Sequence, residues 1–257
     1  EARRPLKQGI LNPEEPESED HLLRLLASVV GLGSNEETRL CFTVPSLPLT
    51  EAEGVRYQIS ALLRLAQKLG MKGCSVEKAL AVVFAEMKDS NYTGLAITFG
   101  AGLVNVCLAY LSVPVISFSI PDGGDRVDEN TARITGEHVL RVRQFKEQKF
   151  SLAHGRPVGD AASERRQRVL TVYYEEMIRK VLASLTERFQ KKDATRLESP
   201  IPVELAGGGA MQEGLPPRYE QIMHETKLPF PATRVRVAEN PAQCAARGAL
   251  IAALSEM

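Results

Sequence analysis

Three β-rich runs follow one another closely between residues 94 and 120, and no other feature of the sequence restricts the fold as much. They cover residues 95–99, 104–110 and 113–119, and each contains β-branched and aromatic side chains. A parallel pairing of successive strands requires a connection of a dozen or more residues, and the connections here are far shorter. The sequence therefore predicts consecutive antiparallel hairpins in this segment.

Helical spacing of apolar residues dominates much of the remaining chain. A capping box at residues 50–53 opens a predicted helix that ends before Gly70, and a long helix is predicted over residues 163–190. Residues 12–20 are rich in proline and acidic side chains and are predicted to form a loop. Shorter helices are predicted over residues 21–30, 77–87, 137–150, 219–226 and 241–254, and further strands over 39–44 and 202–205. This mixture of strands and helices predicts an α/β protein.

Composition and charge exclude several classes of protein. The chain has 257 residues, enough for one large domain or two small ones, and its 32 basic and 32 acidic residues give a formal net charge of zero. Such a balance gives no sign of a nucleic-acid partner. No apolar run approaches the roughly 18 residues that a membrane span requires, and the first residues do not form a signal peptide. We therefore expect a cytoplasmic protein without a transmembrane segment.

The cysteines and histidines indicate no metal chemistry. Cys41, Cys74, Cys107 and Cys244 are far apart in the sequence and form no C-x-x-C motif, which is typical of free thiols in a reducing compartment. The histidines show no spacing typical of metal ligands. We therefore predict no transition-metal site.

Three glycine-containing segments are candidates for binding a phosphorylated ligand. Residues 100–102 form a predicted bend between two strands, where backbone amides can approach a phosphate without interference from a Cβ atom. Residues 122–125 form a turn, and three glycines at 207–209 follow a predicted strand and are expected to open a helix. Taken singly, the first two are also typical of ordinary turns, and the third of a flexible loop. Their order, with a basic helix between the second and third, favours one shared site.

Eight short motifs run along the chain. They are R-P-L-K-Q-G at residues 4–9, V-P-S at 44–46, E-K-A-L-A at 77–81, T-F-G-A-G-L at 98–103, G-G-D-R-V-D at 123–128, K-E at 146–147 and G-G-G at 207–209. The eighth is a closing segment that begins with N-P at 240–241 and ends with A-R-G-A at 246–249. This series resembles the actin-like ATPase superfamily, which includes actin, the MreB-like bacterial actins and the heat-shock chaperone ATPases. The resemblance covers nearly the whole chain. It implies a two-domain, actin-like (ribonuclease H-like) α/β fold with mixed sheets around a nucleotide cleft.

The resemblance implies a role for each matching residue. The ligand would be ATP or ADP with Mg²⁺, and Lys146 and Glu147 would flank its adenine and ribose. Glu77 would help to position the attacking water, and Thr98 stands where the superfamily has an acidic residue that orients the water shell of Mg²⁺. The nucleotide-binding residues implied by the motifs are Gly100, Ala101, Gly102, Gly123, Gly124, Asp125, Lys146, Glu147, Gly207, Gly208 and Gly209. Nucleotide-dependent closing of the two domains would be the output, and whether the chain also self-associates into filaments or binds other proteins stays open at this point.

Two departures limit what the resemblance implies about catalysis. Thr98 offers a neutral hydroxyl, which supplies a weaker field at a metal site than a carboxylate, and Leu103 replaces the usual threonine. The superfamily's first phosphate loop lies on an N-terminal hairpin, so we expect the first domain to be incomplete and an upstream segment to be missing from this chain. We therefore expect nucleotide binding with weak hydrolysis, and whether the protein is an ATPase stays open at this point.

The motifs also predict how the chain divides into domains. We expect residues 1–120 with 239–257 to form the first domain and residues 121–238 to form the second. Two alternatives to a nucleotide-dependent actin-like protein stay open. One is an interaction scaffold that keeps the fold but has lost catalysis, and the other is a small-molecule kinase of the same fold, for which no substrate-binding carboxylate can be identified.

Overall fold

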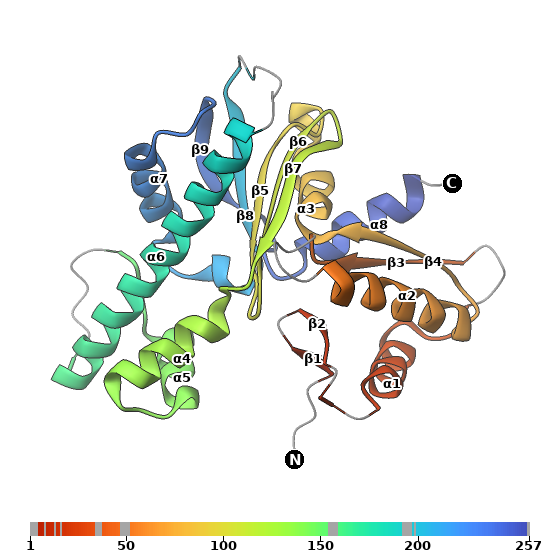
Figure 1. The fold of residues 1–257 in the computed structure, drawn as a ribbon, viewed down its shortest axis with the longest axis horizontal. Coiled ribbons are helices and arrows are strands. Elements are labelled where there is room, and N and C mark those ends of the chain that lie inside the picture. The colour runs from red at the N-terminus through yellow and green to blue at the C-terminus, as the bar shows by residue number, and fades with distance from the viewer. Residues whose placement is uncertain are drawn as a thin grey trace.

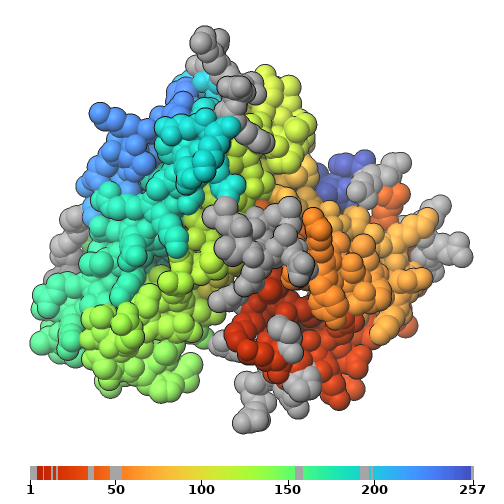
Figure 2. Space-filling view, in the orientation of Figure 1, coloured from red at the N-terminus to blue at the C-terminus, as the bar shows by residue number. Residues whose placement is uncertain are grey.

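The computed structural model describes residues 5–7, 9–12, 14–15, 17–33, 38–46, 52–153, 159–191, 197 and 199–255. This part of the chain forms two lobes that lie side by side (Figure 1). One lobe is built on a five-stranded sheet and the other on a two-stranded parallel sheet. In the space-filling view, the red and orange N-terminal segments gather in one lobe and most of the green to blue segments in the other (Figure 2).

The five-stranded sheet has the strand order β7-β6-β5-β8-β9. Strands β5, β6 and β7 pair antiparallel, which confirms the predicted hairpins, and β5, β8 and β9 pair parallel. The sheet therefore joins strands from both sides of residue 120. The strands are β5 (Gly94–Phe99), β6 (Val104–Tyr110), β7 (Val113–Ile120), β8 (Ile201–Ala206) and β9 (Ala232–Val237).

Large and small side chains lie on opposite faces of this sheet. On β5, Leu95, Ile97 and Phe99 belong to a large core shared with four helices, whereas Ala96 packs on the other face in a cluster with α3. Side chains alternate between the faces of a strand, so one run of residues serves both cores. The helices of the large core are α4 (Gly124–Thr135), α5 (Val139–Gln148), α6 (Ala161–Lys191) and α7 (Leu215–Thr226). The small residues of the second face allow α3 to approach the sheet closely.

The second lobe is a strand–helix–strand unit. Strand β3 (Arg39–Val44) pairs in parallel with β4 (Lys72–Glu77), and α2 (Ala52–Lys68) provides the crossover that a parallel pair requires. Apolar side chains of α1 (Ser18–Val30) pack against the core between α2 and β3. The remaining elements of this lobe are a short hairpin of β1 (Leu6–Lys7) and β2 (Ile10–Leu11), with α3 (Lys78–Glu86) and α8 (Cys244–Ser255) packed beside the strands.

The structure corrects several boundaries. Residues 18–20 are helical, so the predicted loop over 12–20 is wrong there, and Glu77 ends β4 instead of starting a helix. Strands β4 and β9 were not predicted. Strand β4 shows no alternation of apolar residues, the short alternation of valine with arginine in β9 was missed, and both strands depend on pairing with a distant strand. The glycines at 207–209 lead into a short 3₁₀ turn, η2 (Gly208–Met211), not directly into an α-helix. The predicted cap at Thr50 lies outside the described residues.

Helix α6 has 31 residues but carries charged side chains along its length. Across the described ranges, no helix combines the length and the apolar character needed to cross a membrane.

Candidate functional site

A cavity of about 700 Å³ lies beside the end of β5. Its walls come from the bend after β5, the first turn of α4, the end of α5, the middle of α6 and the turn η2. These segments are far apart in the sequence, yet each of them except α6 contributes residues that the motifs single out. The predicted residues that line the cavity are Gly100, Ala101, Gly124, Asp125, Lys146, Glu147, Gly208 and Gly209.

The first two glycine turns pack backbone against backbone. The amide of Gly124 donates to the carbonyl oxygen of Gly100 at 2.9 Å, and the amide of Asp125 donates to that of Ala101 at 2.8 Å. A Cβ atom at Gly123 would lie 2.3 Å from the oxygen of Ala101, so only glycine allows this approach. The start of α4 is therefore held against the hairpin bend, and these two amides of its first turn are already used.

The three glycines after β8 have different roles. Gly207 has a φ of 88°, and a Cβ atom there would lie 2.5 Å from the carbonyl oxygen of Phe99. A Cβ atom at Gly209 would lie 2.8 Å from the Cβ of Phe99. At Gly208 a Cβ atom would meet nothing within 4 Å, although this residue lines the cavity. Gly207 and Gly209 thus bring the turn against β5, whereas Gly208 leaves open space at the cavity wall.

A buried ion-pair network forms one side of the cavity. The carboxylate of Asp128 is 1% exposed, and its Oδ1 lies 2.7 Å from Nζ of Lys146. Arg143 bridges two aspartates of α4, with 3.2 Å to Asp128 and 2.6 Å to Asp125. Asp128 belongs to the G-G-D-R-V-D motif but is not among the predicted site residues, and the sequence gives no signal for Arg143 beyond the basic character of its helix. Lys146 is therefore fixed in place by a buried partner.

An apolar wall faces this network. Tyr174 and Met177 of α6 line the cavity together with Phe150 and Met211. Burial raises the pKa of the Tyr174 phenol, with a smaller contribution from Asp128, so the phenol stays neutral. The sequence did not reveal this wall, because apolar residues at helical spacing are typical of core packing. A flat apolar group can lie against this wall while a charged group meets the opposite side.

Glu77 and Thr98, the predicted catalytic residues, do not line the cavity. The hydroxyls of Ser46 and Ser117 both donate to Oε2 of Glu77, and the Ser46 bond is 3.0 Å long. Thr98 is buried, and its hydroxyl accepts a hydrogen bond of 3.1 Å from the side-chain amide of Asn105. Gly102, Gly123 and Gly207 also lie outside the cavity lining.

Glu77 and Thr98 belong to a group of hydrogen-bonded polar residues that connects the two lobes. This group, the polar joint, also includes Ser46, Asn105, Ser117 and Ser119. The amide of Ser46 donates to Oδ1 of Asn105 at 3.3 Å, and the hydroxyl of Ser119 donates to the carbonyl oxygen of Ser46 at 2.8 Å. The end of β3 is thereby attached to β6 and β7. Buried polar groups that are mutually satisfied favour one particular arrangement of the chain. The carboxylate of Glu77 is thus held at the joint between the lobes.

A family model described as Volactin matches residues 1–253. The chain belongs to the Volactin family. No sequence among curated proteins matches it. Within the part of this Volactin chain that the structure describes, no group of three or more histidine, cysteine or acidic side chains is placed to hold a metal ion.

Solved structures show that this Volactin-family chain has an actin-like fold. MamK, solved as a double helical filament, is 24% identical with a TM-score of 0.70, over 99% of this chain and 81% of MamK. MreB5 of Spiroplasma citri, solved with AMPPNP, is 18% identical with a TM-score of 0.67, over 96% of this chain and 77% of its own. The ethanolamine utilization protein EutJ of Carboxydothermus hydrogenoformans is 18% identical with a TM-score of 0.60, over 95% and 77%.

Proposed function

We propose that this chain binds ATP or ADP with Mg²⁺ in the 700 Å³ cavity and couples the bound nucleotide to movement of the two lobes. The observation that carries the proposal is the convergence of three distant glycine turns with Lys146 and Glu147 on one cavity. Structural neighbours support it, because MreB5 of Spiroplasma citri was solved with AMPPNP and with ADP.

The residues present fit a nucleoside phosphate. The open space at Gly208 lets a ligand approach the backbone, and the apolar wall of Tyr174 and Met177 suits the face of a base. Lys146 and Glu147 would lie near the base and ribose, as the resemblance implies. The bend at Gly100 and Ala101 would receive the phosphates, which carry the Mg²⁺ with them.

The position of the predicted catalytic residues supports binding with slow hydrolysis. Thr98 supplies no carboxylate, and its hydroxyl is engaged by Asn105. The carboxylate of Glu77 is held by Ser46 and Ser117, away from the cavity lining. The same observations support the second candidate, an interaction scaffold on the actin-like fold.

We also propose where the two domains divide. A boundary at residue 120 would separate strands of one sheet, because β5, β6 and β7 pair with β8 and β9 through β5. A boundary before Gly94 keeps that sheet whole. The first domain would then consist of the residues before β5 together with 239–257, since α8 packs on α3 and β3.

Substitution at Gly208 tests the nucleotide site. Gly208→Val places a branched side chain into open space at the cavity, and we expect it to weaken ATP binding by roughly tenfold to a hundredfold while leaving stability nearly unchanged. Calorimetric titration of ATP and ADP with Mg²⁺ measures the affinity, and thermal unfolding measures the stability. Ala161→Val, at an exposed site on α6, is the matched control and should bind as the wild type does.

The outcomes separate the two candidate functions. Binding by the wild type and the control, with weakened binding by Gly208→Val, supports the nucleotide site. If the wild-type chain binds neither ATP nor ADP, the scaffold is favoured and the nucleotide proposal fails. Equal affinity of all three proteins would show that nucleotide binds elsewhere.

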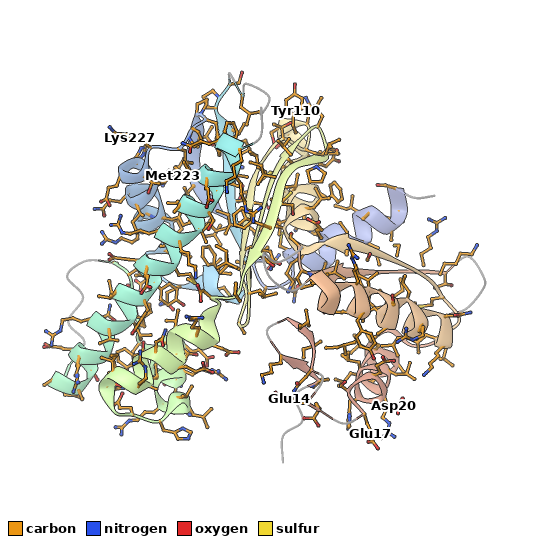
Figure 3. The ribbon with its side chains drawn as sticks, in the orientation of Figure 1. Glu14, Glu17, Asp20, Tyr110, Met223 and Lys227 are labelled. Carbon is orange, nitrogen blue, oxygen red and sulfur yellow. The ribbon has the colours of Figure 1, made fainter. Side chains whose placement is uncertain are left out.

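Self-association through the β6–β7 hairpin is proposed as the second part of the function. The hairpin tip exposes Tyr110, Leu111 and Val113, and Figure 3 shows Tyr110 at that end of the molecule. Leu111 and Ser112 have φ values of 48° and 69°, a left-handed conformation that costs energy for residues other than glycine. A strained turn that exposes apolar side chains is typical of a contact surface. MamK, a structural neighbour, was solved as a filament.

Light scattering tests this surface. We expect scattering by the wild-type chain to rise on adding ATP with Mg²⁺. Leu111→Asp should abolish the rise, because removing a charged side chain from water at a contact between chains costs free energy. Leu140→Asp, at an exposed leucine on α5, is the matched control and should scatter as the wild type does. Scattering by Leu111→Asp equal to that of the wild type would rule out the hairpin as the contact.

A further inference from the structure

The parallel pairing of β3 with β4 places two cysteines side by side. Cys41 and Cys74 are direct partners in the register of this pair. Neighbouring strands lie about 4.8 Å apart, and the Cα atoms of a disulfide are usually about 4.4–6.8 Å apart. The backbone spacing of this pair therefore allows a sulfur–sulfur bond, although the cysteines are 33 residues apart in the sequence.

Both thiols lie on the face of the strands that is covered by α8. Cys41 packs against the cluster of Val76, Ala81 and Ala249. Val76 stands two positions after Cys74 on β4, so the two side chains share a face, and partners in register point to the same side. Two small side chains of α8, Ala249 and Ala252, pack in the same cluster. This leaves room for the two sulfur atoms to approach each other.

The pair is more accessible than the other two cysteines. Cys41 and Cys74 are half-buried, and Cys41 lines a cavity of about 280 Å³, whereas Cys107 and Cys244 are buried. Burial, with a contribution from Glu77, raises the pKa of Cys107, and burial with Glu86 raises that of Cys244 to about 12. Because the thiolate is the reactive form, Cys107 and Cys244 are protected from disulfide exchange and serve as internal controls.

We propose that Cys41 and Cys74 form a reversible dithiol–disulfide site that exchanges with low-molecular-weight disulfides. One cysteine thiolate attacks a sulfur of the external disulfide, whose S–S bond breaks and releases one thiolate. The second cysteine thiolate then attacks the mixed disulfide at the protein sulfur and releases the other thiolate. In sum, the two protein thiols lose two protons and two electrons, and the external disulfide is reduced to two thiols.

The geometry favours a reducible bond over a permanent one. The Cβ atoms of a disulfide are about 3.5–4.5 Å apart, which is less than the spacing of the strands, so the two strands must draw together at this position. Strained disulfides are readily reduced. The pairing of Val44 with Glu77 lies three residues further along both strands, so the bond would hold the strands together next to the joint where Ser46 contacts Glu77. This inference does not depend on the proposed nucleotide binding.

Oxidation of the intact chain by glutathione disulfide tests the proposal. At mildly alkaline pH we expect the number of cysteines in the thiol form to fall from four to two and the protein mass to fall by about two mass units, the mass of two hydrogens. Digestion with trypsin should yield one linked species that joins residues 40–56 to residues 73–78. Dithiothreitol should restore all four thiols.

Matched serine variants identify the pair. Cys107→Ser/Cys244→Ser should still lose two thiols, whereas Cys41→Ser should form at most a mixed disulfide with glutathione and no internal link. The proposal is overturned if the wild-type chain keeps four thiols, if it forms only mixed disulfides, or if the link joins two chains or includes Cys107 or Cys244. The decisive sample is the wild-type protein, so a folding defect in one variant does not affect the outcome.

Discussion

Replacing Gly248 with alanine is expected to lower the free energy of unfolding by about 3 kcal/mol, because the added methyl group overpacks the contact between α8 and α3. A Cβ atom at Gly248 would lie 1.7 Å from the carbonyl oxygen of Ala81 and 2.4 Å from its carbonyl carbon. The obstacle is helix backbone, which cannot rotate away, so the two helices would have to separate. Urea unfolding followed by circular dichroism measures the loss.

The same change in another helix provides the control. Gly54 lies in α2, and a Cβ atom there would meet only the terminal methyl of Ile10, at 3.0 Å. Gly54→Ala should keep or raise stability, since alanine is favoured over glycine in a helix by about 1 kcal/mol. Equal effects of the two substitutions would show that α3 and α8 do not pack as closely as described.

Removing the carboxylate of Asp128 is expected to cost about 3–5 kcal/mol of stability, because it leaves a cation without its buried partner. Asp128 is 1% exposed and contacts both Lys146 and Arg143. Lys146 is itself only 14% exposed, so water cannot replace the lost charge partner effectively. Thermal and urea unfolding of Asp128→Ala would measure the effect.

Asp125 offers a matched control on the same helix with a shared partner. Its carboxylate is 34% exposed and lies 2.6 Å from Arg143. Because ion pairs near the surface contribute roughly 0–1 kcal/mol, Asp125→Ala should cost less than about 1 kcal/mol. A comparable loss for both variants would contradict a buried network centred on Asp128. Asp128→Asn should fall between the two, since an amide keeps hydrogen bonding but not charge.

Local features of the sequence were sufficient to predict much of the fold. The antiparallel hairpins from residue 94 to 120 followed from connections too short for any other pairing. The strand over residues 39–44 was predicted with its observed bounds, and the long helix differed from α6 by two residues at the start and one at the end. Such features depend on residues that are close together in the sequence, so they can be recognised from the sequence alone.

Some residues of the candidate cavity were predicted from the sequence and others were missed, and the difference between the two groups has a physical cause. Gly100, Gly124 and Gly208 line one cavity, and they could be recognised beforehand because glycine-containing turns are evident in the sequence itself. Arg143 was missed because its importance depends on the buried carboxylate of Asp128, fifteen residues away. The hydrogen bond that Ser117 donates to Glu77 could not be predicted either, because the two residues are forty positions apart in the sequence.

Turn residues, helix periodicity and connection lengths act over a few residues, so the order and type of most elements can be derived from the chain alone. Strands β4 and β9 exist because distant strands supply their hydrogen bonds. The pairing of Cys41 with Cys74 and the closing of a cavity around Lys146 likewise depend on register and packing between segments remote in sequence. These long-range contacts are set by how the two lobes fold together, because burial and pairing partners are properties of the assembled chain.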